Sequence, residues 1–290
     1  MANSNEIDDV TGVETTGHDW DGIKELNNPL PRWWLWTFYL CILFAIGYVI
    51  AYPAIPGLNG VSKGLLGWSS RADIRQELSA AEQANSAVIG KIKSSNITDI
   101  LANENLRTFA VAAGASTFKV RCATCHGSGA QGGPGFPNLN DNSWLWGGKP
   151  EEILQTITHG IRDPSDIDTR TSLMPAFGQD KILTNDQIVA VASYVRQISK
   201  QEADATLAAT GAKIFADNCA ACHGDNGEGK KEMGAPQLSD AIWLYKGDLN
   251  AITRQINYPR HGVMPAWGSR LGEVSVKELA AYIHSLGGGE

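Results

Sequence analysis

Two five-residue stretches carry the most reactive side chains of this sequence. Residues 122–126 read CATCH and residues 219–223 read CAACH, so each places two thiols three positions apart and an imidazole directly after the second thiol. Three kinds of site share this pattern in part: a redox-active dithiol, half of a zinc site, and covalent haem attachment. In the third, both thiols bond the porphyrin and the adjacent histidine binds its iron.

Covalent haem attachment explains the two motifs best. A redox-active dithiol is expected beside a βαβ unit, and no β-branched run of strand length adjoins either motif. A zinc site would have to combine two pairs that are 97 residues apart, and it would leave both histidines without a role. We therefore predict two haem c groups, attached through Cys122 and Cys125 and through Cys219 and Cys222, with His126 and His223 as proximal iron ligands.

Both motifs belong to two copies of one longer pattern. AGASTFKVRCATCHG (113–127) matches TGAKIFADNCAACHG (210–224), DNSWLWGGKPEEILQTI (141–157) matches DAIWLYKGDLNAITRQI (240–256), and SLMPAFG (172–178) matches GVMPAWG (262–268). Each copy ends in a stretch with helical apolar periodicity, at 183–198 and 274–286. The pattern predicts an all-α fold with tandem haem domains at residues 108–201 and 202–290.

The repeated methionine is the expected distal ligand. Met/His coordination raises the reduction potential of a haem, as electron transfer between cytochromes requires. Met174 and Met264 share the Met-Pro-Ala-aromatic-Gly context, so we expect His126 to pair with Met174 and His223 with Met264, each pair within one copy. Met233 lies in a loop that the first copy lacks and is interpreted as structural.

Several other side chains near the motifs have simpler interpretations. His159 and His261 each precede a glycine before the methionine segment, so either could replace methionine on iron. The tryptophans Trp144 and Trp243 are expected to wall the haem pockets. His18 and His284 are interpreted as a tail residue and a residue on a helix face.

A transmembrane helix is predicted at residues 33–52. These twenty residues carry no charge, have aromatic residues at both ends, and follow Arg32; Pro53 ends the run. A cleaved signal peptide would need a short basic leader, whereas residues 1–32 are acidic, with seven carboxylates. Cys41 in mid-helix is interpreted as a small packing residue. Residues 53–107 form a partly helical spacer, with helix starts near Ser70 and Asn96.

The charge distribution and the haem motifs bear on location. The formal net charge is -7, which argues against nucleic acid as a partner. We expect a single-pass protein of a bacterial inner membrane. Because haem c is attached outside the cytoplasm, the haem domains are expected in the periplasm and residues 1–32 are expected to form a cytoplasmic tail.

Two family resemblances extend these predictions. The Pro137-Asn138-Leu139 and Pro236-Gln237-Leu238 segments resemble the proline turn of class I cytochromes c, whose carbonyl accepts a hydrogen bond from the proximal histidine. The stretch TGHDWDGIKELNNPLPRWWLWTFYLCILFAIGYVIAYP (16–53) resembles the N-terminal signature of the membrane-anchored di-haem subunit, subunit III, of cbb3-type cytochrome c oxidases. The resemblance continues through both haem domains.

The second resemblance implies a function and partners. Such a subunit takes electrons from a soluble or membrane-bound c-type cytochrome and passes them toward the mono-haem cytochrome c subunit and the catalytic haem–copper subunit. On this interpretation the chain is a non-catalytic component of an oxidoreductase, and residues 17–20 and the anchor dock on the oxidase core. Two alternatives remain open: a di-haem peroxidase, which needs an available iron position, and an anchored donor to another reductase.

Overall fold

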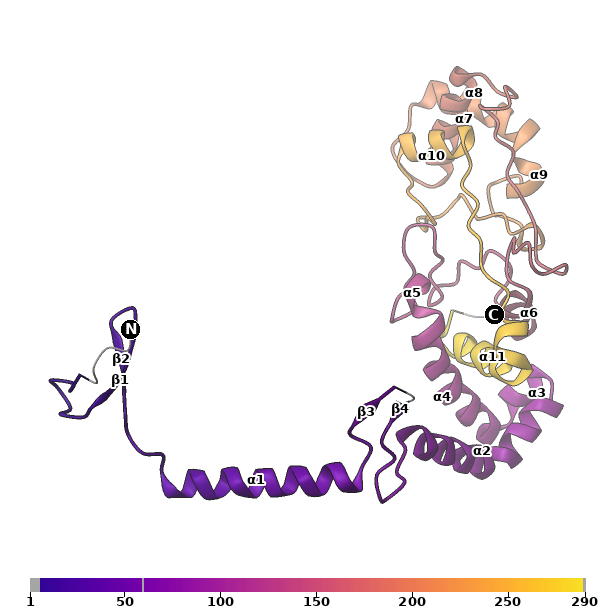
Figure 1. Ribbon diagram of the computed structural model, residues 1–290. Coiled ribbons are helices and arrows are strands. Elements are labelled where there is room, and N and C mark those ends of the chain that lie inside the picture. Colours follow the sequence, from indigo (N-terminus) through magenta and orange to yellow (C-terminus); the bar gives the residue numbers. More distant parts are fainter. Residues whose placement is uncertain (1–5, 59, 289–290) are drawn as a thin grey trace. The chain divides into compact units, whose positions relative to one another are not determined.

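The computed structural model describes residues 6–58 and 60–288, and the chain divides into two compact units, residues 1–84 and 85–290 (Figure 1). The first unit contains two short hairpins, a long apolar helix and the start of α2. Its elements are β1 (Thr15–Trp20), β2 (Ile23–Leu26), α1 (Arg32–Ala51), β3 (Pro56–Gly57), β4 (Gly60–Val61) and α2 (Ser70–Ser94).

The tail expected at residues 1–32 contains a hairpin that the sequence prediction missed. Strands β1 and β2 are antiparallel, and they turn at Asp21 and Gly22, whose φ angles are 52° and 89°. Asp-Gly is a preferred pair for the two-residue turn in which both central residues have positive φ. Glu25 on β2 accepts hydrogen bonds from Thr16 and from the Trp20 indole, both at 3.0 Å, so polar contacts between the strands accompany the backbone pairing.

Helix α1 confirms the predicted apolar helix within one residue at each end. Its twenty residues contain no acidic side chain in the first turn and no basic one in the last, and none of its side chains is buried within the protein. Within the described part of the chain it is the one helix long and apolar enough to cross a membrane. An all-apolar surface that no protein covers is the surface a lipid bilayer would cover.

The second unit consists of helices joined by irregular loops. Its elements are α3 (Ile97–Ala102), α4 (Glu104–Arg121), α5 (Ala123–His126), α6 (Pro150–His159), α7 (Asn185–Ile198), α8 (Ala205–Asn218), α9 (Ala220–His223), η1 (Lys231–Met233), α10 (Leu249–Asn257) and α11 (Gly268–Ser285). Side-chain oxygens cap five of these helices at their N-termini, from Asn96, Asn103, Thr184, Asp204 and Asp248. The helix start expected near Asn96 is therefore confirmed.

Part of the predicted spacer contributes to the core of this unit. Ile92, Ile97 and Ile100 are buried in one cluster with residues of α4 and α11. The Lys277 ammonium on α11 donates to the carbonyls of Ile92, Lys93 and Ser95, at 3.4, 2.9 and 2.8 Å, at the C-terminal end of α2. A cation satisfies helix-end carbonyls that lack a partner within the helix.

The two copies exchange their C-terminal segments. Helix α11, which ends the second copy, packs on α4 and α6 of the first, and α7, which ends the first copy, packs on α8 and α10 of the second (Figure 1). Two separate cores result, and each contains helices from both copies. The tandem arrangement along the sequence is therefore an interlocked pair in space.

Matched contacts at the two helix crossings show the exchange most clearly. Phe118 of α4 meets Tyr282 of α11 with ring centroids 5.3 Å apart and an interplanar angle of 56°; Phe215 of α8 meets Tyr194 of α7 at 5.2 Å and 58°. Each crossing is close because a glycine lies at the contact. A Cβ on Gly114 would overlap the backbone of Glu278, and one on Gly211 would overlap the backbone of Ala190.

Candidate haem sites

The two cysteine motifs lie on equivalent one-turn helices. Helix α5 follows α4 directly and α9 follows α8, with Cys122 and Cys219 at the junctions. Residues three positions apart on a helix share a face, so the thiols of each motif and the following imidazole lie on one side of the turn. No disulfide joins the cysteines of either motif.

Burial keeps the first thiol of each motif neutral. It raises the pKa of Cys122 and that of Cys219 to about 11, with a smaller contribution from the neighbouring thiol of the same motif. Redox-active cysteines have lowered pKa values, because the thiolate is the reactive form. The raised pKa of Cys122 and Cys219 is thus the opposite of what a redox-active dithiol requires.

The cysteines also fail to assemble a zinc site. In the part of the chain that the structure describes, one group of three side chains, His159, Asp166 and Asp168, brings potential metal-ligand atoms within 4.8 Å of one another. No cysteine belongs to it, whereas a structural zinc site needs four ligands around one ion. The zinc alternative is thus unsupported by the geometry.

Both proximal histidines are oriented as expected from the proline turns. The Nδ1 atom of His126 lies 3.1 Å from the carbonyl oxygen of Pro137, and that of His223 lies 2.9 Å from the carbonyl oxygen of Pro236. A carbonyl can only accept, so Nδ1 carries the proton in each ring and the lone pair is on Nε2. Burial lowers the pKa of both histidines, against a smaller opposing contribution from the proline carbonyl. Each ring is therefore a neutral imidazole with Nε2 available to iron.

The methionines lie opposite to the expected pairing. Met264 packs against the core that includes Phe118 and borders Cys122, whereas Met174 packs against the core that includes Phe215 and borders Cys219. Each methionine thus lies with the core of the other copy, because the methionine segment leads directly into the exchanged helix. This placement favours a pairing other than the predicted one, and iron ligation by either methionine stays a prediction. Met174 travels with α7 and Met264 with α11.

Backbone bonds hold each methionine segment on the other copy. Ile161 and Met264 form an antiparallel bridge, with the Ile161 nitrogen 2.9 Å from the Met264 oxygen and the Met264 nitrogen 3.0 Å from the Ile161 oxygen. Further along, the Trp267 nitrogen donates to the Ile157 oxygen at 3.0 Å. The second methionine segment is therefore anchored along the end of α6 and the loop after it.

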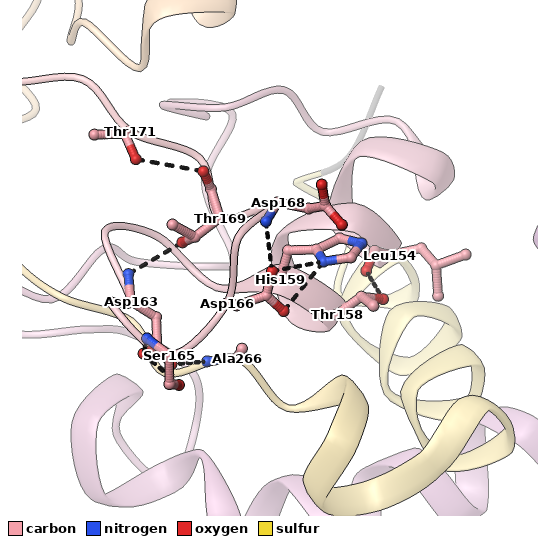
Figure 2. A network of polar contacts seen from close by, with 10 residues as sticks. All are labelled: Leu154, Thr158, His159, Asp163, Ser165, Asp166, Asp168, Thr169, Thr171 and Ala266. Atoms are coloured by element: carbon pink, nitrogen blue, oxygen red, sulfur yellow. Dashed lines mark hydrogen bonds and ion pairs between the residues drawn. The ribbon is translucent and has the colours of Figure 1, made fainter.

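A buried carboxylate adds to this anchoring (Figure 2). Asp163 accepts a hydrogen bond from the Ala266 nitrogen at 2.7 Å and two from Ser165, at 2.9 Å from its nitrogen and 2.7 Å from its hydroxyl. These bonds, the one from Ala266 first, lower the pKa of Asp163 to about 2. Asp163 is therefore ionised at neutral pH and fixes the backbone two residues after Met264.

The other candidate ligands are engaged elsewhere. His159 directs Nδ1 to the Asp166 carboxylate, 3.1 and 3.2 Å from its two oxygens (Figure 2). His261 accepts a hydrogen bond from the Met174 nitrogen through Nε2, at 3.0 Å. Met233 ends η1 with 38% of its surface exposed. Trp144 packs against the same core as Met264, and Trp243 against the same core as Met174; that they wall haem pockets stays a prediction.

The two sites meet at one cavity of about 260 Å³. It is lined by residues of both proline turns and both tryptophan segments, including Phe136, Pro137, Leu145, Pro236, Trp243 and Leu244. Next to it the Gly135 nitrogen donates to the Leu244 oxygen at 2.7 Å, which joins the two copies directly. The two proximal histidines are therefore each one hydrogen bond away from residues that line a shared space.

Comparison with known proteins identifies the family. A model described as the N-terminal domain of cytochrome oxidase-cbb3, FixP, matches residues 12–59, and one described as cytochrome c oxidase, cbb3-type, subunit III, matches residues 109–195 and 206–283. The chain belongs to the cbb3-type cytochrome c oxidase subunit III family. Within that family the two matched segments of the second model correspond to the two copies, and the first model spans the hairpin and α1.

Relatives in this subunit III family match over nearly their whole length. The chain is 56% identical to the cbb3-type cytochrome c oxidase subunit FixP of Sinorhizobium medicae over 98% of both chains. It is 53% identical to the subunit CcoP of Cereibacter sphaeroides over 95% of both, and 47% identical to the subunit CcoP of Azospirillum brasilense over 98% of this chain and 99% of that one. Cytochrome domains of this family bind c-type haem, and the chain is an electron-transfer component of an oxidoreductase complex.

Proposed function

We propose that the chain carries two covalently bound haem c groups and relays electrons between them without catalysing oxygen reduction itself. The thioether bonds would form at Cys122 and Cys125 and at Cys219 and Cys222. His126 and Met264 would hold the first iron, and His223 and Met174 the second. The observation that supports this pairing is that the first cysteine of each motif packs against the same core as the methionine of the other copy, Cys122 with Met264 and Cys219 with Met174.

The chain's own residues explain why such sites would favour electron transfer. Haem iron supplies one-electron chemistry, and sulfur opposite imidazole raises its potential. The proline carbonyls fix the histidine tautomers, the apolar cores exclude water, and Asp163 fixes the backbone beside Met264. The cavity that both proline turns line supports transfer between the two groups within one chain.

The proposed partners follow from the family and from the anchor. Electrons would enter from a c-type cytochrome and leave toward the mono-haem cytochrome c subunit and the catalytic haem–copper subunit of the oxidase. Helix α1 would cross the bacterial inner membrane once, with the β1–β2 hairpin in the cytoplasm and the haem-binding unit in the periplasm. The exposed apolar surface of α1 supports the anchor, and haem c attachment outside the cytoplasm supports the orientation.

Haem content and ligand assignment test the proposal together. The purified chain should exceed its polypeptide mass by two haem groups, and acid–acetone should fail to extract them. In a chain whose first motif is Cys122→Ala/Cys125→Ala, the remaining haem should lose its methionine-to-ferric-iron charge-transfer band in Met174→Ala and keep it in Met264→Ala. The reverse result would restore pairing within each copy.

Association with the oxidase is tested separately. Co-purification in mild detergent should bring oxygen-reducing activity and a haem–copper subunit with the chain. Peroxide turnover by the purified chain alone, abolished by Met174→Ala or Met264→Ala, would instead identify a di-haem peroxidase. A partner reductase without a haem–copper subunit would identify an anchored donor to another enzyme.

A further inference from the structure

The two copies differ most in the segment that leads to methionine. From Ile157 to Met174 the first copy uses 17 residue steps, whereas the second uses eight from Ile256 to Met264. The additional residues form the loop 161–170, which carries Arg162 near its start. This loop has no counterpart in the second copy, so any contact it makes breaks the symmetry of the pair.

Arg162 contacts both methionine segments at equivalent positions. Its Nε donates to the Gly262 oxygen at 2.7 Å, and its Nη1 donates to the Ser172 oxygen at 3.0 Å. Each accepting residue lies two positions before a methionine, Gly262 before Met264 and Ser172 before Met174. One planar guanidinium thus holds two backbone carbonyls that the sequence repeat itself makes equivalent.

The loop backbone is shaped to present this side chain. Arg162 has φ 55°, in the left-handed region that non-glycine residues seldom adopt. Its nitrogen donates to the Arg170 oxygen at 2.8 Å, which closes the loop, while the neighbouring Ile161 bridges Met264. Uncommon backbone conformations persist where surrounding contacts require them, and they gather at functional sites.

A second contact reinforces the junction from the other copy. His261, next to Gly262, accepts the hydrogen bond from the Met174 nitrogen at 3.0 Å. The Met174 backbone is therefore held by a residue of the second methionine segment, and the Met264 backbone by Ile161, the neighbour of Arg162. Each methionine backbone is therefore held by a residue next to a contact of the other.

We propose that Arg162 is a positioning residue shared by both haem sites, which sets both methionine ligands at once. This inference rests on the proposed ligation by Met174 and Met264. Because the guanidinium is half-buried and its two acceptors are backbone carbonyls, its loss leaves both carbonyls short of a donor. Loosening at one methionine would therefore be accompanied by loosening at the other.

Competition with an external ligand tests the proposal. The full chain with both haems, in detergent and in the ferric state, is titrated with imidazole, which displaces methionine sulfur; Met174→Ala and Met264→Ala assign the two phases of the titration. We expect Arg162→Gln to tighten imidazole binding about tenfold at both haems, and to lower both midpoint potentials. Arg162→Lys should give a smaller change at both, because an ammonium cannot donate as a fork.

Matched variants separate positioning from general damage. Arg170→Gln alters the same loop, but the Arg170 guanidinium donates to Trp146, Thr156 and Gln155 of the first copy, so both imidazole affinities should stay unchanged. His261→Phe should affect only the haem that Met174 binds. A response to Arg162→Gln at one haem only, or at neither, overturns the proposal.

Two further outcomes are distinguishable. If Arg162→Gln loses haem or helical content, the test is made with Arg162→Lys. An unchanged affinity for imidazole at either haem of Arg162→Lys then overturns the shared role. If the unaltered chain has no methionine charge-transfer band, or if neither Met174→Ala nor Met264→Ala changes it, the proposed ligation fails before Arg162 is considered.

Discussion

The exchange of C-terminal segments predicts which aromatic pair is energetically coupled. Phe118 is fully buried, and its ring meets Tyr282 of the other copy at 5.3 Å in a tilted arrangement. Tyr194, the matching tyrosine of its own copy, belongs to the other core and contacts Phe215. A double-mutant cycle can therefore distinguish exchange from packing within each copy.

Leucine substitutions keep much of the buried volume while removing the ring contact. We expect Phe118→Leu to lower the free energy of unfolding by about 1–3 kcal/mol, as do most substitutions at a packed core position. Aromatic pairs contribute about 0.5–1.5 kcal/mol beyond the area they bury. The double variant Phe118→Leu/Tyr282→Leu should therefore lose about 0.5–1.5 kcal/mol less free energy of unfolding than the sum of the losses in the two single variants.

The control pair uses the same first substitution. Phe118→Leu with Tyr194→Leu should be additive within about 0.3–0.5 kcal/mol, because residues that share no contacts behave independently. The measurement is urea unfolding of the haem-loaded chain in detergent, followed by ellipticity, with equal slopes required across the cycle. Coupling between Phe118 and Tyr194, with none between Phe118 and Tyr282, would refute the exchanged arrangement.

Three further predictions concern stability. Burial raises the pKa of Glu278 to about 7, so its neutral form contributes stability that is complete below its ordinary pKa and is lost as the pH rises through about 7. From pH 4 to pH 8 the free energy of unfolding of Glu278→Gln should therefore rise by up to about 3 kcal/mol relative to that of the unaltered chain. If urea unfolding gives the same difference between the two chains at every pH in this range, the prediction is wrong. Lys277→Met should lower the free energy of unfolding by about 1.5–3 kcal/mol, because the carbonyls of Ile92, Lys93 and Ser95, at the C-terminal end of α2, lose a charged donor. Hydrogen exchange should increase at residues 88–95, and unchanged exchange there would contradict the capping role. Gly114→Ala and Gly211→Ala should each lower the free energy of unfolding by about 1–3 kcal/mol, because the added methyl group forces two helices apart. Gly90 has open space around it, so Gly90→Ala is the control and should not lower it. Equal melting temperatures for all three variants would count against the close crossings.

Local chemistry was readable from the sequence, and long-range connectivity was not. The Cys-x-x-Cys-His motifs, the proline turns and α1 all depend on residues close together in the chain. Spacing located the motifs, a family resemblance the turns, and an uncharged apolar run the helix. The placement of Cys122 beside the core of Met264 depends on which of the two matching C-terminal helices, α7 or α11, packs on α4. Because Tyr194 and Tyr282 occupy matching positions, and Gly114 and Gly211 do too, the sequence describes both arrangements equally well.

The overlooked elements did leave signals. Aligning the two copies shows the longer segment before Met174, and a long loop in one copy of a repeat often carries function. The Asp21-Gly22 pair between short polar stretches is a hairpin signal that the acidic composition obscured. The roles of Arg162 and Asp163 depend on contacts with residues 100 or more positions away, which no local pattern indicates.

Because the two copies exchange segments, shortening the chain at its C-terminus would damage the core that contains the motif of the first copy. A stop after residue 259 would delete GVMPAWG and α11, which belong to the second copy by sequence, yet the core left incomplete would be the one beside Cys122. The core beside Cys219 would keep Met174 and α7. During synthesis, likewise, the core beside Cys122 is completed after the core beside Cys219, because it needs α11, which follows every helix of the other core in the chain.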